Sequence, residues 1–482
     1  MENFIGNIGP QAILSSPLKK SISIEPGLKV VIILVCLSLL FLPNGLYLFA
    51  STLTLFLITG LFFRPYQPSI FFLCYLLQWT QVISYVFWMN SLGLDINQKY
   101  SMSSIAVCEA LAGLSLMMLI TSRVIKRNFH FSFEELARGA AKWDTRKVLL
   151  LYLFSTIFLS SLGFVLGMTS GFTQVLFSLS GLKWIFLLLY GFIIWSQKKS
   201  SRIFWIICLF EFLASFYSFF SDFKTIILMV IMIVIPFTRK INLKTFFIML
   251  LSGILLGLIF VTWTAVKGEY RLYLNSGKRQ QVVNVERGEA YENLIGQFKS
   301  LSKSKYEKSL VFSFYRLQYI LHLARVMERI PEYMPHENGN LWLSNIKYAL
   351  TPRILNPDKG FLDPSVKTNK YTGFRYATGK QGTSFSLGYF SESYVDFGHF
   401  GMFFPLMLIA LCVGGIYNVI MSFNRLNILL RYAVVSVLLL TFSSFEVDGI
   451  FLIGRLLMNF IVMLAFCHFV FPRIQKWAYL KK

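Results

Sequence analysis

The amino-acid sequence predicts an all-α polytopic membrane protein with about twelve transmembrane helices and one large, partly helical external loop domain. Composition is the first reason, because 55% of the 482 residues are hydrophobic and only 14% are charged, a balance more apolar than a soluble core requires. The second reason is that runs of about 18 or more apolar residues recur, each long enough to cross about 30 Å of hydrocarbon as a helix. The third is a long polar stretch, roughly Val266 to Gly398, set between these runs.

The expected spans divide into about nine before the polar stretch and about three after it. The first apolar run is the shortest of them. The centres are Val35, Thr54, Ser84, Gly113, Phe158, Leu188, Phe210, Ile231, Leu255, Ile409, Val437 and Val462. We therefore expect an N-terminal transmembrane bundle (1–265), an external loop domain (266–398) and C-terminal transmembrane helices (399–482).

Basic residues sort the connections between these spans onto one side. The positive-inside rule makes that side the cytoplasm, so the alternation predicts cytoplasmic termini and an external polar stretch. The first apolar run lies well downstream of Met1 without a small-residue cleavage pattern, so we expect a retained anchor. The residues on the basic side are Lys19, Lys20, Arg64, Arg123, Lys126, Arg127, Lys198, Lys199, Arg239, Lys240, Arg425 and those from Arg473 to Lys482.

The charge balance points to an anionic partner. The net charge is +23, and part of the excess lies in the external stretch, where the positive-inside rule does not apply to a long loop. Cations gathered at the outer membrane face attract lipid headgroups or lipid-linked phosphates. We therefore expect membrane lipids and a lipid-linked anion as partners.

Cysteine, histidine and glycine patterns narrow the chemistry further. All six cysteines lie in predicted spans, which argues against a disulfide framework. The five histidines show no metal-ligand spacing, and no Gly-rich phosphate loop occurs in the cytoplasmic connections. We expect no metal, no cofactor and no nucleic-acid partner, and ATP-driven transport is disfavoured.

Two helices are predicted inside the external stretch. Gly288–Ser300 and Tyr306–Ile330 have helical patterns, and Pro331 ends the second. The following Pro335–Gly388 is rich in Pro, Gly, Asn and Lys, which predicts irregular structure. A loop this long favours a functional role over a passive connection.

The Tyr306–Ile330 segment carries the clearest pattern. Four polar residues recur at helical spacing and predict a solvated face: Gln318, His322, Arg325 and Arg329. Arg316 instead shares a helical face with apolar residues, namely Phe312, Ile320, Leu323 and Met327. A guanidinium among apolar side chains requires an anion or the membrane boundary, so Arg316 is a candidate ligand-binding residue.

The chain returns to apolar sequence through Gly388–Gly401, which contains Glu392, Tyr394 and Asp396. The carboxylates can simply solvate a helix start, where negative charge suits the helix dipole. In a functional interpretation, one of them orients or deprotonates an acceptor hydroxyl, and Glu392 is the preferred residue.

Three segments carry a resemblance to a known family. They are the exit from a span at Trp263–Arg271, the turn Pro352–Lys359 and the re-entry Gly388–Gly401. Together they resemble the oligosaccharide repeat-unit polymerases, the O-antigen polymerases of the Wzy type. The likeness covers roughly Phe219 to Val419 and the overall topology.

The resemblance implies a glycosyltransferase of the C-type membrane architecture in the bacterial cytoplasmic (inner) membrane. Such an enzyme polymerises undecaprenyl-diphosphate-linked repeat units into O-antigen or capsule-type polysaccharide on the outer face. It is expected to work without a metal, using basic residues to hold the diphosphate. A chain-length regulator and a flippase are the implied protein partners.

Site residues follow from position. We expect Glu392, Arg316 and Arg353 to be catalytic. The predicted substrate-binding residues are Lys267, Arg271, Lys359, Tyr394, Asp396, Lys224, Arg455 and His322. Asp396, His322 and His336 are alternatives to Glu392 as general base, and an interfacial pair with Asp222 is the alternative role for Lys224.

Other interpretations stay open at this point. An O-antigen ligase, which moves a finished chain to a lipid A core, would share the architecture and the arginines. A lipid-linked oligosaccharide flippase is the non-enzymatic alternative, but it predicts charges along the spans rather than in one outer segment. Glu109 and Glu211 lie within spans, where burial of a charge is costly, and structural pairing is expected for both.

Overall fold

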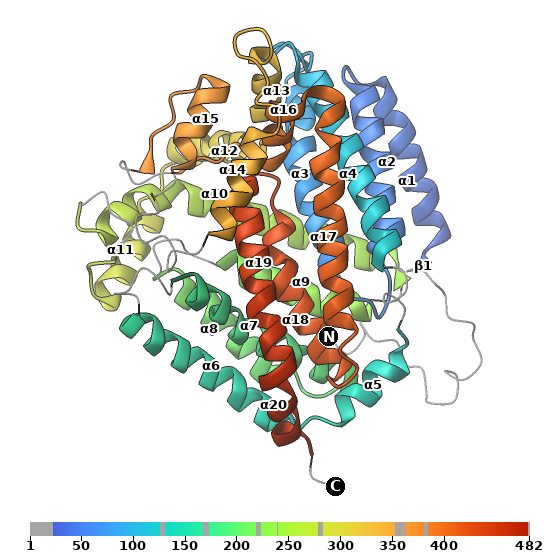
Figure 1. Cartoon of the computed structure of the whole chain (residues 1–482), viewed down its shortest axis with the longest axis vertical. Helices are drawn as coiled ribbons and strands as arrows, with labels where there is room; N and C mark the ends of the chain where they lie inside the picture. The colour runs from blue at the N-terminus through green and yellow to red at the C-terminus, as the bar shows by residue number, and fades with distance from the viewer. Residues whose placement is uncertain are drawn as a thin grey trace.

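The computed structural model describes residues 23–125, 131–166, 173–217, 223–238, 240–277, 283–351, 360, 363–379 and 384–480. It is helical almost throughout (Figure 1). Within these residues the strands form one parallel pair, in which β1 (Ser23–Ile24) lies beside β2 (Lys240–Ile241). The all-α prediction is confirmed.

The first half of the chain forms the helices on which the rest is built. They are α1 (Pro26–Ser38), α2 (Gly45–Phe62), α3 (Ile70–Ser91), α4 (Ser103–Ile125), α5 (Phe133–Ala141), α6 (Thr145–Leu166), α7 (Thr173–Gln197), α8 (Arg202–Ser215), α9 (Phe223–Val234) and α10 (Leu243–Leu274). Each predicted span centre in this half lies in one of these helices, and none lies in α5. Helix α5 is amphipathic and begins at a capping box formed by Ser132 and Glu135.

The second half contains shorter helices followed by apolar ones. They are α11 (Arg287–Lys299), α12 (Lys303–Leu317), α13 (Ile320–Arg329), α14 (Asn340–Leu350), α15 (Pro364–Thr372), α16 (Tyr389–Gly401), α17 (Phe403–Met421), α18 (Ile428–Leu439), α19 (Gly449–Ala465) and α20 (Phe471–Ala478). The three remaining span centres lie in α17, α18 and α19.

Several helices are long and apolar enough to cross a membrane. In the described part of the chain there are seven such stretches: α2, α3, α4, Ser178–Gln197 of α7, α10, α17 and Gly449–Ala478. Three apolar helical stretches are shorter: Pro26–Phe41, Phe223–Phe237 and Ile428–Ser443. Continuous apolar sequence takes this form because a helix satisfies its own backbone hydrogen bonds where no water is available.

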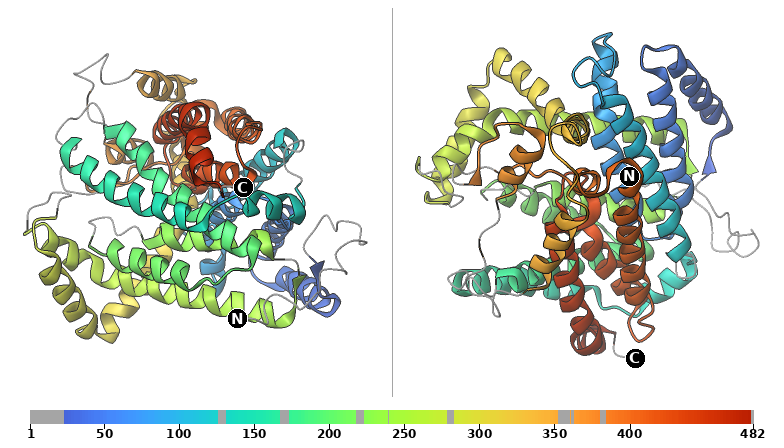
Figure 2. Two further views of the ribbon diagram at one scale, coloured as in Figure 1. Left: turned by 90° about the horizontal axis from the view of Figure 1, so that it is seen from below. Right: turned by 45° about the horizontal axis from the view of Figure 1, so that its top comes forward.

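Helix α10 is oriented differently from its neighbours. It runs across the molecule, crosswise to the upright α4 and α17, as Figure 1 and the left view of Figure 2 both show. Its apolar window is almost entirely unburied, unlike those of α3 and α7. The last turns are an exception, because Trp263, Val266 and Tyr270 pack into a small aromatic core with Phe216 and Phe223.

Some of the predicted cytoplasmic connections lie together, whereas Lys19, Lys20, Lys126, Arg127 and Arg239 lie outside the described residues. Figure 1 shows α5 and α20 at one end of the molecule and α13 and α16 at the other. Hydrogen bonds tie the basic connections to one another near α5 and α20: Lys147 Nζ to the Trp477 carbonyl oxygen (2.9 Å), Lys199 Nζ to Thr145 Oγ1 (2.9 Å) and Gln475 Nε2 to the Arg425 carbonyl oxygen (3.2 Å).

The external stretch meets the predicted external connection between α3 and α4. The Glu328 carboxylate of α13 accepts hydrogen bonds from the Ser101 backbone N–H at 2.5 Å and the Ser101 hydroxyl at 3.0 Å. The Trp88 ring at the end of α3 stacks on Phe314 of α12 with ring centroids 5.5 Å apart. These contacts fix α12 and α13 against the ends of α3 and α4.

The structure corrects three expectations about this stretch. The predicted helix Tyr306–Ile330 is two helices, because the backbone leaves helical geometry at Gln318. The segment predicted as irregular contains α14 and α15. The polar stripe is not a solvated face, since Gln318 and His322 are buried.

The helix break also changes the surroundings of Arg316. Ile320, Leu323 and Met327 belong to α13 and are buried, whereas Phe312 on α12 is exposed. Arg316 therefore does not sit on one continuous apolar helix face, and that argument for it was wrong. Its exposed position gives it a different set of neighbours.

Candidate functional site

Four basic side chains from three helices converge near the end of α10. Lys267 and Arg271 lie on α10, Arg316 on α12 and Lys224 on α9. In the described residues, the charged groups that act most strongly on the Lys267 ammonium are the other three cations. We call these four residues the cation cluster. A cluster of like charges is unfavourable by itself and favours an anion at the same place.

Local packing holds this cluster in position. The Lys267 ammonium lies 5.9 Å from the Phe312 ring centroid, and the Lys224 ammonium lies 5.1 Å from the Phe260 ring centroid. An ion pair between Lys305 Nζ and Glu269 Oε2, at 2.7 Å, ties α12 to α10 beside them. The aromatic faces support the ammonium groups through cation–π attraction without neutralising them.

A second charged group is buried among α14, α15, α16 and α19. Lys367 of α15 pairs with Glu392 Oε1, and its Nζ lies 2.8 Å from Asp448 Oδ2. Glu392 is fully buried, and its other oxygen accepts from Asn345 Nδ2 at 3.1 Å and from the Gly449 backbone N–H at 2.7 Å. We call Glu392, Lys367 and Asp448 the carboxylate–lysine cluster.

Backbone contacts complete this cluster. Asp448 Oδ1 accepts from the backbone N–H groups of Leu387 at 2.7 Å and Gly388 at 2.9 Å. Glycine is required at 449, because a side chain there would meet Glu392 Oε2 at 2.7 Å. The cluster therefore connects the start of α16 to the start of α19 through the side chain of α15.

Burial shifts the titration of these groups. Burial raises the pKa of Glu392 to about 7, although the Lys367 charge opposes this shift. Burial also lowers the pKa of Lys367, but the Glu392 and Asp448 carboxylates outweigh it, so that the pKa lies above its ordinary value. Lys367 is thus held in its charged form, and Glu392 is the group of the pair that titrates near neutral pH.

Tyr319 is influenced by charges of both clusters. Its buried ring sits at the turn from α12 to α13, and its hydroxyl donates to the Ser386 carbonyl oxygen at 2.6 Å. Burial raises its pKa, the Glu446 and Asp448 charges raise it further, and Arg316 lowers it. Arg316 and Asp448 therefore both lie within electrostatic range of a single phenol.

Asp396 and Tyr394 lie in α16, and their described contacts are to the protein itself. The Asp396 oxygens accept from the backbone N–H groups of Leu341 at 3.0 Å and Trp342 at 2.7 Å, which caps the start of α14. The Tyr394 hydroxyl donates to the Ile330 carbonyl oxygen at 3.0 Å. Both side chains are buried.

His322 lies in an aromatic nest rather than in a charged site. Its ring stacks on Tyr319 with centroids 4.3 Å apart and contacts Phe374 and Tyr376. Burial lowers its pKa to about 4, so it is neutral at physiological pH. His336, the other histidine considered as a base, contacts the backbone carbonyl oxygens of Tyr394 and Val395, each at 3.2 Å.

Of the remaining predicted site residues, some lie outside the described part of the chain and one lies on α19. Arg353 and Lys359 lie outside the described residues, as does Asp222, the alternative partner of Lys224. The Arg455 guanidinium on α19 lies 5.7 Å from the Phe451 ring centroid, and the structure records no ion pair from it to Glu446 or Asp448, both of which are described.

Structural pairing was expected for Glu109 and Glu211, and the structure shows it. Glu109 Oε1 lies 2.6 Å from His399 Nδ1, which links α4 to α16. Glu211 Oε2 lies 3.1 Å from Lys183 Nζ, and Glu211 Oε1 accepts from the Tyr152 hydroxyl at 2.5 Å. These carboxylates therefore join helices.

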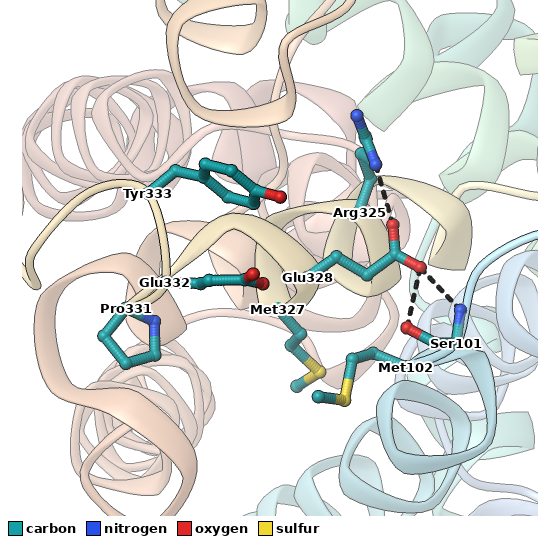
Figure 3. Close-up of a pocket in the computed structure, with 8 residues that line it drawn as sticks. All are labelled: Ser101, Met102, Arg325, Met327, Glu328, Pro331, Glu332 and Tyr333. Carbon is teal, nitrogen blue, oxygen red and sulfur yellow. Dashed lines mark hydrogen bonds and ion pairs between the residues drawn. The ribbon is translucent and has the colours of Figure 1, made fainter.

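A hollow of about 400 Å³ opens beside α13 (Figure 3). Three of its polar residues are engaged with each other: Arg325 Nη1 donates to Glu328 Oε2 at 2.8 Å, and Glu328 also accepts from Ser101. None of the four cation-cluster residues lines it. The hollow is therefore separate from the site proposed for the anion.

Sequence reasoning missed Lys367, Asn345 and Asp448 as neighbours of Glu392. Lys367 is one of many lysines in a segment predicted to be irregular, and nothing in its local pattern distinguishes it. A weak signal existed for Asp448, which lies directly before an apolar run and close to Glu446. Their proximity to Glu392 depends on tertiary contacts, because Lys367 is 25 positions and Asn345 is 47 positions from it in the sequence.

The comparisons with known proteins leave the activity open and identify the family. No curated protein and no solved structure matches the chain. One family model does, and it extends from the first apolar helix to the last. The match covers residues 34–473, so the chain belongs to the family described as "Domain of unknown function (DUF8712)".

Proposed function

We propose that this protein is a metal-independent membrane glycosyltransferase that polymerises undecaprenyl-diphosphate-linked repeat units on the outer face of the bacterial cytoplasmic membrane. The observation that carries the proposal is the cation cluster, in which Lys267 lies within electrostatic range of Arg316, Arg271 and Lys224. The family-level resemblance to O-antigen polymerases supplies the substrate class. The long apolar helices support a location in the membrane.

The cluster fits the leaving group of this reaction. When a sugar hydroxyl attacks the anomeric carbon of the donor, the bond from that carbon to the diphosphate oxygen breaks and negative charge gathers on the diphosphate. Cations fixed in advance stabilise that charge more in the transition state than in the ground state. At an effective dielectric near 20, the attraction between one cation and one phosphate charge about 4 Å apart is roughly 4 kcal/mol, before the cost of desolvation is subtracted.

The cluster lies where a lipid diphosphate would be found. Lys267 and Arg271 follow the apolar part of α10, so a headgroup near them would have its lipid tail beside apolar side chains. Lys267 also keeps a partly apolar environment through Phe312. A cation at such a boundary is strengthened as an anion binder, since less water competes for it.

The carboxylate–lysine cluster supplies the proposed acid–base group. In this proposal Glu392 accepts the proton of the attacking hydroxyl, and Tyr319 lies within electrostatic range of both Arg316 and Asp448. Arg353 and Lys359 are proposed to add charge from the turn that follows α14, and Arg455 from α19. The proton is then released to solvent after the lipid diphosphate departs.

The first test measures lipid binding by purified protein in nanodiscs. We expect Lys267→Ala and Arg316→Ala each to weaken binding of undecaprenyl diphosphate about tenfold, because each removes one charge from the cluster. The matched control is Lys303→Ala on the same α12, whose side chain is 90% exposed and which should bind normally. Equal binding by all three variants would remove the cation cluster from the site.

The second test measures the reaction itself. Wild-type protein incubated with defined lipid-linked repeat units should yield products longer by whole units in mass spectrometry. A product formed only when lipid A core is added would identify a ligase instead. Transfer of substrate across the nanodisc or vesicle bilayer without any new glycosidic bond would identify a flippase.

A further inference from the structure

A second cavity borders the last turn of α12, the helix that also carries Arg316. It has a volume of about 160 Å³ and opens between the end of α3, the connection to α4 and the last turn of α12. The residues that matter for its chemistry are Trp88, Lys99, Tyr315 and Gln318. All four belong to the described part of the chain and none is used by the site above.

Gln318 is the most informative residue of this cavity. Its side chain is 1% exposed, yet neither the amide oxygen nor the amide nitrogen has a hydrogen-bond partner among the described residues. A primary amide offers two donors and two acceptor positions, and leaving all of them buried and unpaired is costly. Because the same side chain lines the cavity, the missing partners are best supplied from the cavity.

The other walls favour a ring-shaped polar ligand. Trp88 and Tyr315 form an aromatic corner with centroids 6.0 Å apart, and Trp88 is fixed by stacking on Phe314. The Lys99 ammonium lies 4.7 Å from the Tyr315 ring centroid at the exposed rim. Apolar C–H faces and surrounding hydroxyl groups occur together on a sugar ring, which matches aromatic walls combined with an amide and an ammonium.

We propose that this cavity is a pyranose-binding subsite, in which Trp88 and Tyr315 contact the ring and Gln318 and Lys99 hydrogen-bond to its hydroxyl groups. The choice of ligand class rests on the function proposed above. Arg316 directly follows Tyr315 and precedes Gln318 by two residues, so the subsite lies within one helical turn of the cation cluster. A glycan could thus be held at the last turn of α12 while the diphosphate is held at the cation cluster.

The direct test is saturation-transfer NMR on the full-length protein in nanodiscs, since detergents with sugar headgroups would compete. The probes are the methyl glycosides of glucose, galactose, N-acetylglucosamine and rhamnose. We expect at least one to receive saturation from the wild type, and Trp88→Leu and Gln318→Leu each to weaken its binding by more than about tenfold. Absence of transfer from all four, or unchanged binding by both variants, would overturn the subsite.

Thermal unfolding without sugar separates this role from a structural one. Gln318→Leu removes an unpaired buried amide, so we expect an unchanged or higher midpoint. The matched control is Gln197→Leu on α7, which loses a hydrogen bond from Nε2 to the Ala140 carbonyl oxygen at 2.6 Å and should unfold at a lower temperature with sugar binding intact. A fall for Gln318→Leu equal to that of the control would show that the amide is paired within the fold.

The outcomes also separate this inference from the proposed function. If the protein binds a glycoside through Gln318 but does not lengthen lipid-linked units, the subsite is supported and the proposed polymerase activity is refuted. If the protein lengthens lipid-linked units but Trp88→Leu and Gln318→Leu leave glycoside binding unchanged, the proposed polymerase activity is supported and the subsite is refuted.

Discussion

Glu392 combines full burial, three hydrogen-bonding or charged neighbours and a pKa raised to about 7, chiefly by burial. These contacts are compatible with a base that exchanges a proton near neutral pH and with a carboxylate on α16 that holds α14, α15 and α19 in place. Glu392 differs in this respect from Asp396, whose two backbone hydrogen bonds account for its position as a helix cap. The two roles of Glu392 predict different consequences of one substitution.

Glu392→Gln keeps the side-chain shape but cannot accept a proton as a base. If the proposed chemistry holds, this variant should fold, bind undecaprenyl diphosphate normally and lose at least about a hundredfold in the rate of glycan growth. Binding and product length would be measured on the same nanodisc preparation. Normal glycan growth would exclude Glu392 as the base, and a large loss of thermal stability would identify a structural role.

The pH dependence gives an independent check on the same residue. A raised pKa means that the carboxylate form of Glu392 accumulates only as the pH rises through about 7. The rate of glycan growth should therefore rise roughly tenfold between about pH 6 and about pH 8, because a base acts in its deprotonated form. Initial rates across this range test the expectation, and a rate that falls with rising pH contradicts it.

At the scale of elements, α15 contributes one side chain that joins α16 to α19. Lys367 neutralises part of the charge on two buried carboxylates, and no other cation within the described residues pairs with them. Removing one partner from a buried ionic group leaves the other charges uncompensated. Lys367 therefore contributes an electrostatic link between α15 and the starts of α16 and α19.

Lys367→Met should lower the free energy of unfolding by about 3–5 kcal/mol, because it leaves Glu392 and Asp448 facing each other without a cation. Adding Glu392→Gln to this variant should restore part of the loss, since one of the two charges is then removed. Chemical denaturation of the two single variants and the double variant would measure the coupling. Strictly additive losses would show that the two residues do not interact.

The sequence predicted helices well where apolar runs are long, as for Gly113 in α4 and Ile409 in α17. It also predicted α11 closely, because its boundaries follow local signals. It missed the break at Gln318, since the residues on both sides keep a helical pattern and the break is stabilised by packing between distant elements. The same limitation hid the pairing of Lys367 with Glu392, which no local spacing encodes.

At the scale of the whole molecule, the two sets of connections are separated. The basic connections are linked by hydrogen bonds near α5 and α20, and the polar stretch meets the ends of α3 and α4 at the opposite end of Figure 1. The distribution of basic residues predicts that these two ends face opposite sides of the membrane. The orientation of the protein in the membrane can therefore be tested with one position at each end.

A membrane-impermeant maleimide should label a single cysteine introduced at Lys303 in intact cells, because α12 is predicted to face outward. A cysteine introduced at Lys476 of α20 should react only after the membrane is permeabilised. The background would carry serine at all six native cysteine positions. The reverse pattern would place the cation cluster in the cytoplasm and refute the proposed function.

The crosswise course of α10 has a consequence for how a long-chain lipid reaches the protein. A helix of 32 residues is about 48 Å long, and the described residues leave most of its apolar flank uncovered. An isoprenoid tail could lie along that flank and slide sideways from the bilayer, without threading through a closed tunnel. The lipid would then enter and leave at the membrane-facing surface of the protein, and Lys267 and Arg271 would bind its anionic end.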